Sequence, residues 1–135
     1  MKRLILFLLV AVVLAGCQPK AVTGETVSVA DGSYQSVTPD KLNTMSKNKD
    51  FVFINVHTPF AGNIAGTDLS IAYDQIEQNL SQLPADKNAK IVLYCRSGHM
   101  SKITAEKLVS LGFTNIWDLK GGMVDWEQAG YKVEK

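Results

Sequence analysis

Two short runs of apolar residues constrain the fold of this chain more than any other feature. Residues 51–56 read FVFINV and residues 91–94 read IVLY, without the alternation of polar and apolar positions seen in half-exposed strands. Such runs are typical of strands that are covered on both faces, as in parallel sheets. Parallel neighbours need a crossover connection, which is usually a helix. The chain is therefore predicted to alternate strands and helices.

The segments around these runs fit that alternation. Thr38 and Pro39 provide a cap and a first helical residue, and Ala105, Leu108 and Val109 lie on one face of a further helix. The expected helices cover residues 38–46, 73–83, 101–111 and 123–129, and the expected strands 34–37, 51–56, 69–71, 91–94 and 115–118. We therefore expect an α/β three-layer sandwich, with a mostly parallel five-stranded sheet flanked by helices.

Composition limits the remaining possibilities. The chain has 135 residues, 46% of them hydrophobic, which suits one domain with an ordinary core. Its formal net charge of +1 argues against a nucleic-acid binder. Two cysteines are too few for a disulfide scaffold or, by themselves, a structural zinc site, and no metal ion is expected.

The N-terminus has the pattern of a targeting segment. Lys2 and Arg3 precede an apolar run over residues 4–15, whose length as a helix is about 18 Å. That is too short for a bilayer core of roughly 30 Å and is typical of a signal peptide. Residues 14–17 (LAGC) resemble the lipobox of bacterial lipoproteins, which implies cleavage after residue 16 and lipidation of Cys17. The alternative is an ordinary signal peptide with an incidental cysteine.

The predicted organisation follows from this assignment. Residues 1–16 form the signal peptide, residues 17–32 the lipidated cysteine and a flexible tether, and residues 33–135 the folded domain. By analogy with sorting in Gram-negative cells, Gln18 in place of Asp favours the outer membrane, with the domain facing the periplasm. Cys95 is then the one free thiol of the mature chain.

Cys95 has the sequence context of a nucleophile. It follows the 91–94 strand and precedes a helix by about six residues, and sites in α/β sheets form at the carboxyl ends of strands. Loop amides and a helix N-terminus there favour an anion and hence a thiolate. Gly98 supplies the unusual backbone torsion that such a loop needs. Arg96, His99 and Lys102 are candidate cations.

These motifs resemble the rhodanese family of single-domain sulfurtransferases. The family's active loop reads approximately CRSGNRS, and residues 95–101 read CRSGHMS. Similar segments are residues 53–59 (FINVHTP), 63–66 (NIAG) and 119–126 (LKGGMVDW), and the resemblance extends from about residue 36 to 132.

The resemblance implies a persulfide mechanism. The Cys95 thiolate would take sulfane sulfur from thiosulfate or a low-molecular-weight persulfide and pass it to a thiol or cyanide, without a metal or organic cofactor. His57 and Lys102 are candidates for the pocket wall. The sulfur-binding loop would consist of Arg96, Ser97, Gly98, His99, Met100 and Ser101.

Three departures from the family pattern bear on the substrate. Met100 replaces an arginine that helps to bind an anionic donor in the family, and Asn55-Val-His57 replaces Asp-Val-Arg. The segment from His57 to Gly66 is also a few residues shorter than usual.

Several alternatives remain open. The foremost is a non-catalytic module that binds an envelope protein or senses persulfides, an interpretation that Met100 favours. A cysteine phosphatase would need arginine at position 101, where this chain has Ser101. A metal site using Cys95, His99 and His57 has only weak spacing support. A redox role through mixed disulfides lacks a second cysteine.

Overall fold

The chain folds around one six-stranded sheet. The structure, a computed structural model, describes residues 16, 18 and 20–135, so Cys17 and nearly all of the predicted signal peptide lie outside it. The strand order is β1-β2-β7-β6-β3-β5, and all neighbours are parallel except β1 and β2. The strands are β1 (Glu25–Val29), β2 (Gly32–Val37), β3 (Val52–Asn55), β5 (Leu69–Ser70), β6 (Ile91–Tyr94) and β7 (Ile116–Leu119).

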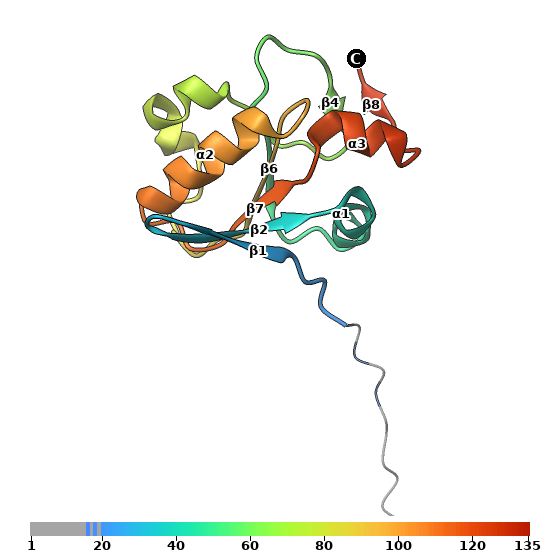
Figure 1. The fold of residues 1–135 in the computed structure, drawn as a ribbon, viewed down its shortest axis with the longest axis horizontal. Helices are drawn as coiled ribbons and strands as arrows, with labels where there is room; N and C mark the ends of the chain where they lie inside the picture. The colour runs from blue at the N-terminus through green and yellow to red at the C-terminus, as the bar shows by residue number, and fades with distance from the viewer. Residues whose placement is uncertain (1–15, 17, 19) are drawn as a thin grey trace, which may run out of the picture.

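Helices cover both faces of the sheet (Figure 1). On one side α2 (His99–Ser110) packs on β7, β6 and β2, together with the short 3₁₀ helices η1 (Tyr73–Gln75) and η2 (Glu77–Gln82). On the other side lie α1 (Pro39–Ser46) and α3 (Gly122–Gln128). A second, two-stranded ladder pairs β4 (Asn63–Ile64) with β8 (Val133–Glu134). The predicted three-layer α/β sandwich is thus confirmed.

The sheet has six strands rather than the predicted five, because β1 forms a hairpin with β2. The sequence analysis placed residues 25–29 in the tether, but they pair with residues 32–36. Val27 and Val29 are partly buried against the core, and the Gln35 amide donates to the Thr26 hydroxyl at 3.1 Å. The tether is therefore shorter than expected, and the sheet begins at Glu25.

A second correction concerns the predicted helix over residues 73–83, which is η1 followed by η2. Asn79 has non-helical torsions (φ −117°, ψ 19°), and its amide donates to the backbone carbonyl of Gln75 at 2.8 Å. Asparagine commonly competes for backbone groups in this way and so interrupts a helix. The other expected helices are present, and Thr38 caps α1 as predicted, because its side chain accepts from the Lys41 amide.

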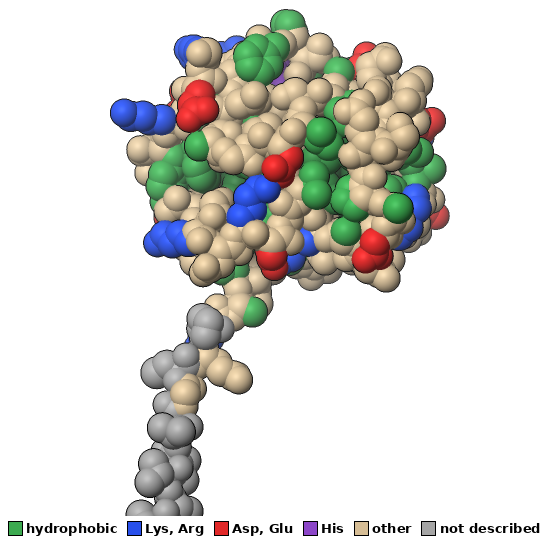
Figure 2. All heavy atoms as spheres, turned by 180° about the vertical axis from the view of Figure 1, so that it is seen from behind, with side chains coloured by type: hydrophobic (Ala, Val, Ile, Leu, Met, Phe, Trp, Pro, Cys, Tyr) green, Lys and Arg blue, Asp and Glu red, His purple; other side chains and the backbone are tan. Residues whose placement is uncertain are grey.

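The two faces of the sheet carry separate apolar cores. The α2 face contains Ile54, Leu93 and Leu108, and the opposite face contains Phe53, Tyr94 and Trp126. The molecular surface shown in Figure 2 mixes apolar side chains with both acidic and basic ones. Among the described residues, no helix has the length and apolar character needed to cross a bilayer.

Candidate active site

The candidate site lies where β6 ends and α2 begins. Cys95 directly follows β6, and α2 begins at His99, so the connecting loop is shorter than the six residues predicted. Gly98 precedes the helix with φ +97°, a left-handed conformation that favours glycine. The strand, the glycine and the helix thus lie in the predicted order.

The sulfur of Cys95 is buried among polar atoms of this loop. The Gly98 amide donates to Sγ at 3.0 Å, and the thiol donates to the Ser101 hydroxyl, with Sγ 3.6 Å from Oγ. That hydroxyl in turn donates to the Gly98 carbonyl oxygen at 3.2 Å. Cys95 is only 1% exposed. Within the described part of the chain, Gly98 provides the one backbone amide that hydrogen-bonds to the sulfur, where the sequence predicted a ring of amides.

The other loop residues divide by exposure. Arg96, Ser97, His99 and Lys102 are exposed, whereas Ser101 is fully buried. The side chain of Met100 is partly buried against the apolar core on the α2 face. The first turn of α2 therefore presents a thioether to that core.

Two backbone amides at the N-terminus of α3 hydrogen-bond to the loop. The Met123 amide donates to the Cys95 carbonyl and the Val124 amide to the Arg96 carbonyl, both at 2.9 Å. Gly121 (φ +72°) and Gly122 (φ +58°) bring the chain into this position. The sequence analysis included these glycines only in the 119–126 segment and missed their contact with the loop.

His57 lies on the side of the loop that carries Arg96. The His57 amide donates to Asn55 Oδ1 at 3.0 Å, while Asn55 Nδ2 donates to the Gly62 carbonyl at 2.9 Å. Asn55 thereby fixes both ends of the segment that follows β3. Burial, and secondly the positive charge of Arg96, lower the pKa of His57. The imidazole is therefore neutral at physiological pH and close to the loop.

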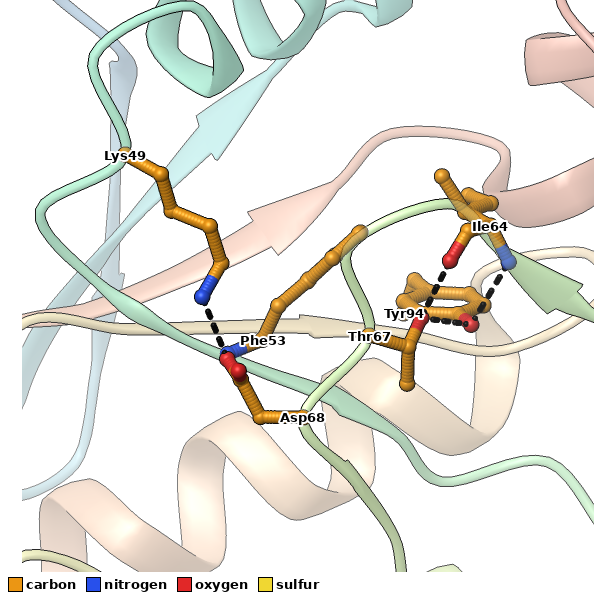
Figure 3. Close-up of polar contacts among 6 residues, drawn as sticks. All are labelled: Lys49, Phe53, Ile64, Thr67, Asp68 and Tyr94. Atoms are coloured by element: carbon orange, nitrogen blue, oxygen red, sulfur yellow. Dashed lines mark hydrogen bonds and ion pairs between the residues drawn. The ribbon is translucent and has the colours of Figure 1, made fainter.

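Tyr94 anchors the neighbouring 63–67 segment against β6 (Figure 3). Its buried hydroxyl accepts from the Ile64 amide at 3.0 Å and lies 2.7 Å from the Thr67 hydroxyl. Next to it, Asp68 accepts from the Phe53 amide at 2.8 Å and from the Lys49 ammonium at 2.6 Å. The residue that precedes Cys95 is thus held by a hydrogen-bonded network.

A pocket of about 450 Å³ lies beside Arg96. Its walls come from the segment after β3, from α3 and from the C-terminal residues. Phe60 on its rim is 64% exposed. The pocket is lined by Phe60, Ala61, Gly62, Arg96, Met123, Val124, Glu127, Val133 and Lys135. It combines apolar surface with both signs of charge.

Asp118 is a buried acid that the sequence analysis did not single out. It is fully buried on β7, and neither carboxyl oxygen has a hydrogen-bond partner among the described residues. Burial raises its pKa from 3.8 to about 7, against smaller lowering effects from the Ser101 hydroxyl and the charge of Lys102. An acidic residue inside an otherwise apolar strand (IWDL) was the available signal.

Comparison with known proteins identifies the fold family. Residues 38–129 match the profile described as a rhodanese-like domain. The chain belongs to the rhodanese-like family. Residues 1–18 match the prokaryotic membrane lipoprotein lipid attachment site. The rhodanese-like domain is thus carried on a lipid-anchored, membrane-associated chain, as the sequence analysis predicted.

Individual relatives agree with the family. The chain is 29% identical over 102 residues to an uncharacterized protein of Synechocystis sp., covering 74% of this chain and 56% of that protein. It is 25% identical over 91 residues to a sulfurtransferase of Allochromatium vinosum, covering 66% and 83% respectively. A rhodanese-related protein from Thermoplasma volcanium superposes with a TM-score of 0.64 at 29% identity, covering 74% of this chain and 97% of that structure.

Proposed function

We propose that this chain is a sulfurtransferase that carries sulfane sulfur on Cys95. The observation that supports it most directly is the environment of Sγ, which has the Gly98 amide at 3.0 Å and the Ser101 hydroxyl at 3.6 Å. An N–H donor directed at sulfur stabilises the thiolate. The family and its sulfurtransferase relative are consistent with this chemistry.

The reaction has two nucleophilic steps. In the first, the Cys95 thiolate attacks the outer sulfur of the donor and forms an S–S bond. The donor's own bond to that sulfur breaks, and sulfite (from thiosulfate) or a thiolate (from a persulfide) leaves with the electron pair. In the second, a thiol or cyanide attacks the outer sulfur, and Cys95 leaves again as a thiolate. Dividing the transfer in this way is ordinary covalent catalysis.

The charges around the loop favour a low-molecular-weight persulfide as donor. Thiosulfate is a dianion, and the side chain at position 100 is a neutral, core-packed methionine. Arg96 is the remaining guanidinium of the loop, but it is exposed. A single exposed cation attracts a dianion weakly, because water and salt screen its charge. The reacting group of a persulfide carries at most one negative charge and requires less compensation.

We further propose that Cys17 carries the lipid and that residues 18–21 tether the domain to the membrane, since Val22 already packs against the core and the Thr23 carbonyl accepts from Lys41. In a cell with two membranes, Gln18 in place of Asp supports a position at the outer membrane, facing the periplasm. Its sulfur donor and acceptor would then be small molecules of that compartment.

The proposal is tested by the intact mass of the purified protein after incubation with glutathione persulfide or thiosulfate. The expected result is a gain of one sulfur atom by the wild type, removed by cyanide or a thiol. Cys95→Ser is the matched control and should gain none. A Cys95→Ser variant that gains sulfur as well as the wild type would overturn the assignment.

The second candidate function is a non-catalytic binding module. The observation that favours it is the pocket beside Arg96, whose rim residue Phe60 is 64% exposed while Cys95 is 1% exposed. This surface suits an apolar segment of an envelope protein better than a small anion. A wild type that stays unmodified with every donor would support this second candidate over the first.

A further inference from the structure

Asp118 lies on the strand next to the one that ends directly before Cys95. It lies on β7, opposite Leu93 of the neighbouring strand β6, two residues before Cys95. Leu93 and Cys95 both belong to the core on the α2 face. The first turn of α2, which carries Ser101, lies over this part of the sheet. A carboxyl on β7 and a thiol after β6 thus lie on neighbouring strands, on the face that α2 covers.

A purely structural role does not account for an acid at this position. Asp118 is 0% exposed, and its two carboxyl oxygens have no hydrogen-bond partner within the described residues. Burying a carboxylate in this way is costly, whereas an apolar residue of similar size would cost nothing. An acid at such a site is therefore better explained by a functional role.

The groups that face Asp118 come from two neighbouring elements. From α2, the Ser101 hydroxyl and the more distant charge of Lys102 act on the carboxyl and favour its ionised form. From β2, Tyr34 is close enough that the charge of Asp118 helps to raise its pKa, after burial and ahead of Glu106. Ser101 is the one of these groups that also contacts the Cys95 sulfur.

We propose that Asp118 accepts the thiol proton of Cys95 through the hydroxyl of Ser101, and so generates the nucleophile of the sulfur-transfer reaction. This inference rests on the proposed function, since it assigns a role in that same site. Asp118 does not contact the reacting sulfur. It acts on Cys95 only through Ser101 and is therefore a positioning residue.

The proton transfer involves only the side chains of Cys95, Ser101 and Asp118, and every bond broken is matched by one formed. The S–H bond of Cys95 breaks as its proton moves to Ser101 Oγ, and the original Ser101 O–H bond breaks as that proton moves to an Asp118 oxygen. The products are a thiolate, a neutral serine and a neutral carboxylic acid. No electron is gained or lost overall. The negative charge moves from a carboxylate that has no hydrogen-bond partner among residues 20–135 to a sulfur that accepts from the Gly98 amide.

The required rearrangement is a change of hydrogen-bond partner at Ser101. In this structure the Ser101 hydroxyl donates to the Gly98 carbonyl oxygen and already accepts from the thiol. Redirecting the serine proton from the carbonyl to Asp118 completes the relay. Because the pKa of Asp118 is about 7, the carboxyl is able both to accept and to release a proton at physiological pH.

The test is a pH titration of the thiolate by its ultraviolet absorbance, using the full lipidated protein in detergent and Cys95→Ser as the baseline. A lipidated Cys17 is a thioether and does not ionise, so the signal reports Cys95. Two groups that share a proton titrate as a pair. We therefore expect the wild-type thiolate to form in two steps.

Asp118→Asn and Ser101→Ala should each lose the first step, the former by removing the acceptor and the latter by removing the bridge. Asp74→Asn, a substitution of an exposed acid, should keep both steps. A one-step wild-type titration, or a first step that persists in either folded variant, would overturn the proposal. The titration needs no sulfur donor, so its outcome is distinguishable from failure of the mass-shift experiment.

Discussion

Gly122 lies against the carbonyl oxygen of Cys95 so closely that a β-carbon at position 122 would overlap with it. The same β-carbon would lie 2.8 Å from the carbonyl carbon of Arg96. Both contacts are with backbone atoms of the candidate sulfur-binding loop, which have no freedom to move aside. The residue after Gly121 is therefore constrained by the shape of a loop more than twenty positions earlier.

Gly122→Ala is accordingly expected to displace the loop and abolish sulfur loading. Its matched control is Gly112→Ala, because Gly112 also has a positive φ (+91°) but no atom within 4 Å of the β-carbon position. The control should lose about 1–2 kcal/mol of unfolding free energy from backbone strain alone. Urea unfolding and intact mass measure the two effects. Normal loading by a folded Gly122→Ala protein would contradict the proposed packing.

Met100→Arg should raise kcat/KM with thiosulfate, because it adds a cation at the start of α2 beside the loop. An increase of about tenfold corresponds to roughly 1.4 kcal/mol, within the range of one charge-assisted hydrogen bond. Met100→Gln has similar length without the charge and should leave thiosulfate turnover unchanged. Equal rates for the two variants would show that the donor is recognised elsewhere.

Tyr94→Phe should destabilise the fold by about 1–3 kcal/mol, since it leaves the buried Ile64 amide without an acceptor. Tyr131→Phe is the comparison, because the Tyr131 hydroxyl also makes a short bond, to Asp40 at 2.7 Å, but at the exposed surface. Its loss should cost clearly less than the loss of the buried Tyr94 hydroxyl. The free energy of unfolding of each variant, measured in urea, tests this difference. Similar losses of unfolding free energy in the two variants would contradict a structural role for the Tyr94 network.

Asp118→Asn should change the pH dependence of stability in a definite direction. The folded-state pKa of Asp118 is about 7, above its ordinary value of 3.8. Between these two pH values the folded protein therefore keeps a proton on Asp118 that the unfolded chain has already released. Wild-type stability therefore falls as the pH rises through this window, on the order of 4 kcal/mol from this group. The variant lacks that loss.

Unfolding of the two proteins in urea at about pH 4 and about pH 8 provides the measurement. The variant should gain in stability relative to the wild type at the higher pH. A difference that is constant with pH would show that Asp118 titrates normally.

The central strands were predictable because their environment determines their composition. The span of β6 was predicted correctly, since four consecutive apolar residues fit a strand covered on both faces. By contrast, β1 reads ETVSV at the edge of the sheet, where polar side chains face water. Such a segment has the composition of a linker, and only its pairing with β2 distinguishes it from one.

The site was predictable where its residues are contiguous. Cys95, Gly98 and Ser101 lie within one short motif, and the structure places them in mutual contact. Gly122 and Asp118 were missed as parts of the site because their relation to the loop depends on strand order, which brings β7 next to β6. An acid within an apolar strand marks such a position, but its partner lies on another element.

The two hydrogen bonds from α3 to the Cys95 loop also set an order of assembly. The amides of Met123 and Val124 come from the last fifteen residues of a chain that is synthesised from its other end. A nascent or truncated polypeptide that ends before Gly121 contains the cysteine but not the support for its loop. The Cys95 loop is therefore supported only after α3 has been synthesised and has folded against it.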